Sequence, residues 1–196
     1  AKLVSGEIRF LGSSLVGLSE AQFESLRGNQ IGYIYQNPMT ALNPVLTIGE
    51  QVIEAIEANT DMRGKNAQEY AIQLLERADV SFAEDRLQKY PHQLSGGLCQ
   101  RIVFAIAIAA KPKLIIADEP TTALDVTVQQ SVLQTLIKLS QQEQIAIILI
   151  THDIGVIAET CDYVYVLRYG KHVEQDATNK VLQRPTQDYT RSLMAS

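Results

Sequence analysis

Two unbroken apolar runs dominate the pattern of hydrophobic and polar positions along the chain. Residues 114–117 are followed directly by Asp118 and Glu119, and residues 145–150 lead into His152. Short runs that are apolar throughout and end in polar residues are typical of parallel strands buried on both faces. In open α/β sheets, ligands bind at the carboxyl ends of such strands. The pattern therefore predicts an α/β fold with a site at these strand ends.

Apolar residues at helical spacing predict amphipathic helices around the two strands. Ser19 is a candidate cap within one of these segments, at residues 15–26. The other predicted helices span residues 47–57, 67–78, 102–110, 126–142 and 154–160. Alternating positions predict strands at 6–10 and 30–38, and a hairpin of 163–167 and 172–174 that we expect at the sheet edge.

A Ser-Gly-Gly sequence precedes the apolar helical run at 102–110. Ser95 can cap a helix that begins at the glycine pair, and Gly96 and Gly97 allow backbone N–H groups to approach an anion closely. The helix N-terminus adds positive partial charge at the same place. These residues therefore predict a phosphate contact.

The two carboxylates after residues 114–117 have separate predicted roles. Asp118 offers the oxygen ligand that Mg²⁺ prefers, and Glu119 can orient or deprotonate a water molecule. The sequence thus indicates phosphate chemistry supported by a divalent cation.

The order and close spacing of these segments resemble the nucleotide-binding subunits of ABC transporters. Residues 94–100 are similar to the family signature, 114–119 to the Walker B strand and 123–125 to the D-loop, while Gln36 and His152 match the Q-loop and the switch histidine. The resemblance implies ATP and Mg²⁺ as cofactors and a P-loop NTPase-type parallel sheet core flanked by helices, with a helical subdomain insertion. By this resemblance the catalytic residues are Glu119, His152 and Gln36, the nucleotide-binding residues are Ser95, Gly96, Gly97, Gln100 and Asp125, and the Mg²⁺ residues are Asp118 and Gln36.

Three further segments are similar to the branch of importers for oligopeptides, dipeptides and nickel. They are residues 39–44, 90–93 and 185–193. Two departures from that branch stand out. Gln187-Asp188 replaces the usual His-Pro, and Cys99 replaces an arginine or similar polar residue, a change expected to alter contacts on the helix surface.

The resemblance divides the chain into portions of one partial nucleotide-binding domain, residues 1–196. Residues 1–46 and 111–196 correspond to the RecA-like core, and 47–110 to the helical subdomain with the signature helix. Two simpler readings stay open: residues 47–90 are two packed helices without a partner, and Gln36 is a polar residue that ends an edge strand.

A Walker A loop, G-x-x-x-x-G-K-[ST], is the missing part of this set. The segment from Gly12 carries Leu18 at the lysine position, and Gly64-Lys65 and Gly170-Lys171 lack the upstream glycine. We expect the P-loop and the N-terminal strands of the family domain upstream of Ala1. On that expectation the 196-residue chain binds Mg-ATP poorly and hydrolyses it negligibly.

The net charge and the length of the apolar runs restrict the kinds of partner that we expect. The net charge of −5 argues against nucleic acid, and no apolar run approaches the ~20 residues that span a bilayer. The resemblance implies a second nucleotide-binding domain, integral membrane permease subunits and, indirectly, a solute-binding protein as partners, at the cytoplasmic face of the plasma membrane. The alternatives are a soluble ABC ATPase that acts on DNA or ribosomes, and a non-catalytic fragment.

Overall fold

Three parallel strands form the central sheet of the computed structural model, which describes residues 5–122 and 124–195. They are β3 (Ile31–Ile34), β4 (Leu114–Asp118) and β5 (Ala146–Ile150), with β4 in the middle. Ile34 pairs with Ala117, and Asp118 pairs with Ile150, so the carboxyl ends of all three strands lie at one end of the sheet. The predicted α/β fold is confirmed.

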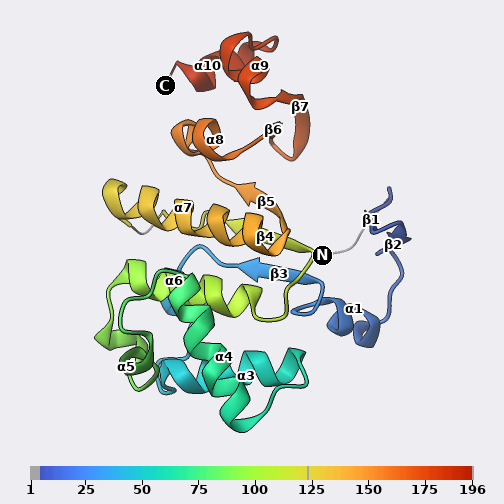
Figure 1. Ribbon diagram of the computed structural model, residues 1–196. Helices are drawn as coiled ribbons and strands as arrows, with labels where there is room; N and C mark the ends of the chain where they lie inside the picture. Colours follow the sequence, from blue (N-terminus) through green and yellow to red (C-terminus); the bar gives the residue numbers. More distant parts are fainter. Residues whose placement is uncertain (1–4, 123, 196) are drawn as a thin grey trace.

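Helices α6 (Gly96–Ile108) and α7 (Val126–Glu143) cover one face of this sheet (Figure 1). Phe104 of α6, Ile115 of β4 and Leu136 of α7 are buried together in the main hydrophobic core. Burial of these large side chains supplies the main driving force that holds helices and sheet together.

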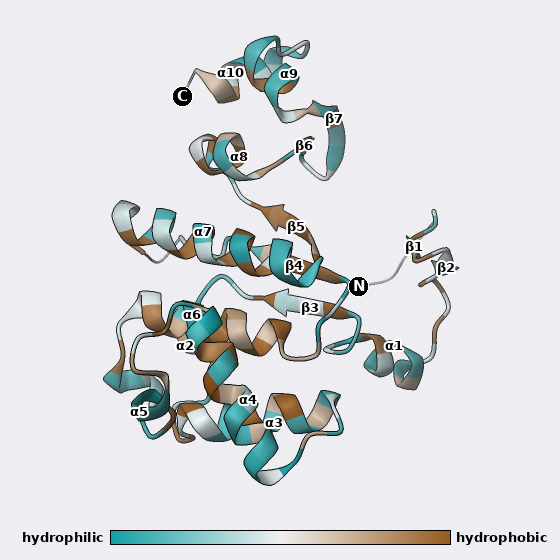
Figure 2. Ribbon diagram, viewed as in Figure 1, coloured by the Kyte–Doolittle hydropathy of each residue, from teal (hydrophilic) through white to brown (hydrophobic). Residues whose placement is uncertain are grey.

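The other face of the sheet is exposed among the described residues. Tyr33, Ile148 and Ile150 are 42%, 50% and 47% exposed, although β4 and β5 are among the most apolar segments in Figure 2. The prediction that β5 is buried on both faces is therefore wrong for this structure. An apolar run does not reveal which residues will cover each face of a strand.

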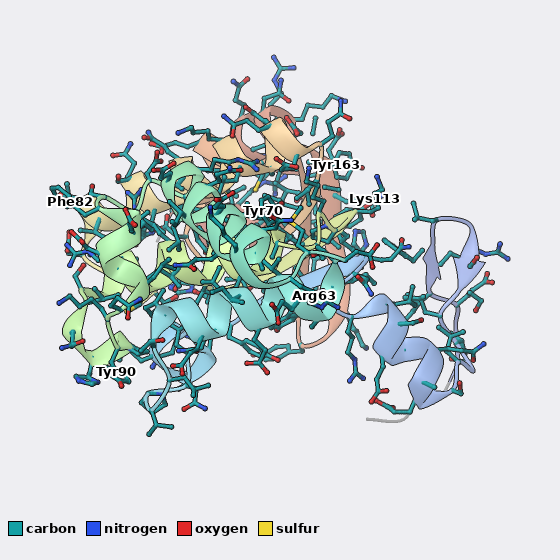
Figure 3. The ribbon with its side chains drawn as sticks, turned by 60° about the horizontal axis from the view of Figure 1, so that its bottom comes forward. Arg63, Tyr70, Phe82, Tyr90, Lys113 and Tyr163 are labelled. Atoms are coloured by element: carbon teal, nitrogen blue, oxygen red, sulfur yellow. The ribbon has the colours of Figure 1, made fainter. Side chains whose placement is uncertain are left out.

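Helices α3 (Ile48–Asn59), α4 (Gly64–Arg77) and α5 (Ala83–Leu87) form a further layer beneath α6 (Figure 1). A capping box between Thr47 and Glu50 begins α3. The observed bounds of α3 and α4 confirm both long helices predicted here, at 47–57 and 67–78. A short 3-10 helix, Pro91–Gln93, leads into α6. Figure 3 shows this layer from its outer side, with Phe82 and Tyr90 toward one end of it and Arg63 away from that end.

The N-terminal segment lies to one side of the sheet (Figure 1). It contains a minimal hairpin, β1 (Arg9–Phe10) and β2 (Ser13–Ser14), followed by α1 (Glu20–Leu26); the short α2 (Pro38–Ala41) comes after β3. Ser19 caps α1 as predicted, but the helix does not extend back to Leu15 because Gly17 has a φ of +85°.

The C-terminal segment has its own small core. It consists of α8 (Ile154–Thr160), β6 (Tyr163–Arg168), β7 (Lys171–Ala177), α9 (Thr178–Gln183) and α10 (Asp188–Met194). The predicted hairpin is confirmed, but its expected place at the edge of the main sheet is wrong. In the described structure β6 and β7 form a separate sheet, because Val164 and Val166 pack with Val181 of α9.

Within residues 5–122 and 124–195, no helix combines the length and the apolar character that crossing a membrane requires.

Candidate functional site

Polar side chains follow the carboxyl ends of all three parallel strands. Gln36 comes shortly after β3, Asp118 ends β4 with Glu119 next to it, and His152 comes shortly after β5. The Glu119 N–H donates to the Ile150 carbonyl at 2.9 Å, which extends the β4–β5 pairing to the site itself. The parallel register therefore places residues that are distant in sequence at one end of the sheet. We call Gln36, Asp118, Glu119 and His152 the strand-end cluster.

Glu119 and His152 are in direct contact. His152 Nδ1 lies 2.6 Å from Glu119 Oε1, and the Thr122 hydroxyl donates to Glu119 Oε2 at 2.6 Å. Both carboxylate oxygens of Glu119 thus have a fixed partner. The backbone of Glu119 has a φ of +48°, a conformation that costs free energy in a non-glycine residue and is concentrated at functional sites.

The contact changes the pKa of both residues. Burial raises the pKa of Glu119, but the hydrogen bonds from Thr122 and His152 outweigh burial, so the pKa is lowered overall. The hydrogen bond to Glu119 and the charge of its carboxylate raise the pKa of His152, although partial desolvation opposes them. Glu119 is therefore held as a carboxylate near neutral pH, the form that can orient or accept a proton from water.

Asp118 is held from the neighbouring strand. The Tyr33 hydroxyl donates to Asp118 Oδ2 at 3.1 Å, and burial together with this hydrogen bond raises the pKa of Tyr33. Gln36 is exposed near the same strand ends. The described residues contain no group of three or more His, Cys, Asp or Glu side chains that could enclose a metal ion. The Asp118 carboxylate nevertheless fits Mg²⁺, which takes one or two protein ligands and completes its shell with phosphate and water oxygens.

The Ser-Gly-Gly sequence begins α6 as predicted. Ser95 Oγ accepts the Leu98 N–H at 3.4 Å as the helix cap. The glycines also have a packing role that the sequence did not reveal. A Cβ atom on Gly97 would lie 2.6 Å from Val128 Cγ1, and one on Gly96 would lie 3.2 Å from Leu124 Cδ2. Both glycines therefore allow the start of α6 to approach the start of α7.

Asp125 caps α7. Its Oδ1 accepts the Val128 N–H at 3.0 Å, so the exposed side chain begins the helix that lies beside Gly97. Ala123, which belongs to the predicted D-loop, lies outside the described residues. The structure thus brings Asp125 next to the start of α6.

Gln100 and Cys99 differ from the surface positions that the sequence suggested. Gln100 has no exposed surface, and both polar atoms of its side chain are without a hydrogen-bond partner in the described structure, so it does not face an open ligand surface here. Cys99 is also fully buried, and its Sγ donates to the Pro91 carbonyl at 3.5 Å. The expectation that Cys99 alters the helix surface is wrong, because this face of α6 points into the core.

Sequence reasoning missed Tyr33 and Thr122. The alternation along β3 puts Tyr33 on the exposed face of the sheet, and Thr122 lies one short turn after Glu119. It also missed a groove of about 830 Å³ lined by α3, the start of α4 and the end of α5, with Glu54, Glu57 and Arg63 on its walls. The lining residues of the groove belong to the helical layer and include none of the strand-end cluster.

Comparison with known proteins agrees with this arrangement. A family model described as ABC transporter matches residues 1–122, more than half of the chain. The chain is 46% identical over 196 residues to a protein described as a probable peptide ABC transporter ATP-binding protein, y4tR, of Sinorhizobium fredii, and it covers 58% of that protein. It is 44% identical over 195 residues to the oligopeptide transport ATP-binding protein AppD of Bacillus subtilis, and it covers 60% of that protein. The chain thus spans about three fifths of the length of these curated relatives.

Solved structures show the same fold. The ATP-binding cassette MJ0796, solved as a dimer bound to ADP and Pi, superposes with a TM-score of 0.77 at 28% identity, over 89% of this chain and 74% of that chain. Clostridium perfringens cbiO1, part of the ABC transporter complex cbiONQ, superposes with a TM-score of 0.81 at 25% identity, over 92% of this chain and 69% of that chain.

Proposed function

The chain belongs to the ABC transporter family, and from this premise we propose that it is part of an ATP-binding and ATP-hydrolysing subunit that powers import of peptides or related small solutes. The observation that carries the proposal is the alignment of Asp118, Glu119 and His152 at adjacent parallel strand ends, with His152 in contact with Glu119. The similarity to relatives described as peptide and oligopeptide transport ATP-binding proteins supports the solute class.

In this proposal each residue of the strand-end cluster has one role. Glu119 is the general base for the attacking water, and its lowered pKa keeps it ionised. His152, 77% exposed beside it, contacts the γ-phosphate. Asp118 and Gln36 hold Mg²⁺, which when bound neutralises charge on the phosphates. Tyr33 fixes the orientation of the Asp118 carboxylate.

The signature residues act on a nucleotide held by a second nucleotide-binding domain. Ser95 and Gly96 are exposed where α6 begins and Gly97 beside them is buried, and the N-terminus of this helix is a suitable surface for phosphate oxygens. Asp125 lies at the start of the adjacent α7 and communicates across the pair. For the buried Gln100, contact with nucleotide requires a rearrangement of α6.

The proposed assembly includes membrane partners. Residues 1–46 and 111–196 form portions of the nucleotide-binding core, and 47–110 form the helical subdomain with the signature helix. The groove between α3, α4 and α5 is the surface that we assign to the permease subunits, with a solute-binding protein acting through them. Because ATP is a cytoplasmic nucleotide, the complex would lie at the cytoplasmic face of the plasma membrane.

The 196 residues alone are proposed to bind Mg-ATP weakly, since none of their glycine–lysine pairs has the Walker A spacing. Titration of Mg-ATP into this chain by calorimetry should give no saturation below millimolar nucleotide. Saturation in the micromolar range would mean that another segment replaces the P-loop.

Hydrolysis is tested in a chimera in which a Walker A segment is joined to this chain. The chimera should bind Mg-ATP and hydrolyse it. The Glu119→Gln variant should retain binding but lose about 10²–10⁴-fold in kcat. Equal rates for the two proteins would contradict the assignment of Glu119 as the general base.

A further inference from the structure

Contacts between α6 and α7 advance in the same direction along both helices. At the start of the pair Gly97 meets Val128, and one turn later Arg101 meets Ser131 and Thr135. The helices therefore lie side by side in parallel. We call this line of contacts the α6–α7 seam. A group that fixes Arg101 on α7 also limits how far Gly97, one turn upstream, can move.

Arg101 makes an unusually complete set of contacts for a side chain near the surface. Its Nη1 donates to the Thr135 hydroxyl at 2.8 Å, its Nη2 donates to the Ser131 hydroxyl at 2.8 Å, and Nη1 lies 3.5 Å from Asp79 Oδ2. The side chain is 14% exposed, and Thr135 is buried. A planar guanidinium bridges several acceptors at once, which lysine cannot reproduce. Loss of Arg101 would leave a buried hydroxyl with fewer partners.

Asp79 ends α4 at a backbone position that glycine usually occupies. The Asp79 N–H donates to Glu76 and the Val80 N–H donates to Leu75, the hydrogen-bond pattern of a Schellman motif. Asp79 occupies the left-handed position of this motif with a φ of +55°, where glycine is preferred.

An aspartate at this position supplies what glycine lacks. Asp79 Oδ2 accepts the Thr135 hydroxyl at 2.9 Å, and Asp79 Oδ1 accepts from Lys138 Nζ at 2.9 Å. The end of α4 is thereby joined to α7 through the same residues that hold Arg101. The side chains of Asp79, Arg101, Thr135 and Lys138 form one network, which we call the Arg101 clamp.

We propose that Arg101 is a positioning residue: the Arg101 clamp fixes the signature residues Ser95–Gly97 against the start of α7 and ties them to the end of α4. The contribution to catalysis rests on the proposed function, in which Ser95–Gly97 face a nucleotide. The clamp joins the end of α4 and the start of α6 to α7, so that these segments move as one unit. A displacement of the helical layer would then reach the signature residues through Asp79 and Arg101.

The test is hydrogen exchange of backbone amides in the 196-residue chain, compared with its Arg101→Gln and Asp79→Gly variants. In both variants the amides of Leu98 to Arg101, at the start of α6, should exchange about tenfold faster or more than in the unaltered chain. Asp79→Gly relieves the left-handed backbone, so this variant would leave stability and exchange unchanged or improved if the Asp79 carboxylate contributed nothing. Arg101→Lys should restore part of the protection.

Arg77→Gln is the matched control, because Arg77 also joins α4 to α7, through Glu143 at the far end of α7. It should loosen that end and leave the start of α6 protected. Unchanged exchange of the α6 amides in both clamp variants, or equal acceleration by Arg77→Gln, would overturn the proposal. The exchange experiment uses no nucleotide, so its result does not depend on ATP hydrolysis. If the variants exchange faster as expected but the chimera does not act on Mg-ATP, the proposed function is contradicted and the clamp proposal still stands.

Discussion

The strand-end cluster and the α6–α7 seam hold the candidate site residues by different means. In the cluster, an exposed His152 is held by short contacts with Glu119 on the neighbouring strand end. In the seam, Gly97 is held by close packing against Val128 and by polar contacts farther along the helices. The cluster therefore depends on the register of the sheet, whereas the seam depends on complementary helix surfaces. Changes in the cluster should alter chemistry with little effect on folding, and changes in the seam should alter stability or position.

The largest expected loss of stability comes from the face of the sheet that α6 and α7 cover. Ile115→Ala removes a fully buried side chain and should lower the free energy of unfolding by about 2–5 kcal/mol. Ile148→Ala is the matched control on the open face, where the side chain is 50% exposed, and should cost about 1 kcal/mol. Urea unfolding measures both. Equal losses would mean that the open face of β5 is covered in solution.

The next effect tests the glycine contact in the seam. Gly97→Ala should be less stable than Gly96→Ala by about 1–3 kcal/mol, because the new methyl group meets the branched Val128 side chain at 2.6 Å. Gly96→Ala meets only the end of the flexible Leu124 side chain at 3.2 Å. Urea unfolding of both variants checks the difference. Adding Val128→Ala to Gly97→Ala should recover much of the loss; no recovery would contradict the assigned contact.

The third test concerns a buried carboxylate in the C-terminal segment, because a buried charge makes stability depend on pH. The Thr190 hydroxyl and the hydrogen bonds from Thr186 lower the pKa of Glu174 to about 2 from its ordinary value of 4.5. A lowered folded-state pKa stabilises the fold above 4.5, and this stabilisation is lost as the pH falls from there toward 2. Glu174→Gln should therefore reduce the loss of stability between these pH values, measured by urea unfolding. A variant with the same pH dependence as the unaltered chain would contradict this role.

The smallest effect concerns the cluster and should leave folding nearly unchanged. Glu119→Gln should lower the pKa of His152 from its raised value toward 6.5, because the carboxylate that favours imidazolium is removed. Because the pKa of His152 is raised in the folded state, its contact with Glu119 stabilises the fold below pH 6.5. That stabilisation is lost as the pH rises through the raised pKa. Proton NMR titration of the three histidines measures the shift. His172 on β7 is the internal control; a His152 pKa unaffected by the substitution would show that the contact is absent in solution.

The contrast between cluster and seam also explains what the sequence could predict. Asp118, Glu119 and His152 could be identified because they lie within two residues of the end of a continuous apolar run, and parallel strands place such ends together. The cap at Ser95 could also be predicted, because a serine before a helix caps it through a hydrogen bond to a residue nearby in the sequence.

Long-range packing could not be read in this way. The burial of Gln100 and Cys99, the approach of Gly97 to Val128 and the link from Arg101 to Asp79 depend on which faces of distant helices meet. The separate β6–β7 sheet was missed for the same reason: alternation reveals a hairpin but not the surface against which it packs.

The most direct test of the account is whether the three strand ends act as one metal–nucleotide site. Mn²⁺, which accepts the same oxygen ligands as Mg²⁺, broadens NMR signals near it, so Mn-ATP is added to isotopically labelled chain. At millimolar concentration the account predicts selective broadening of the Gln36, Asp118 and His152 amides together, reduced by Asp118→Asn. Broadening centred on Glu54 and Glu57 in the helical groove, with the strand ends unaffected, would contradict it.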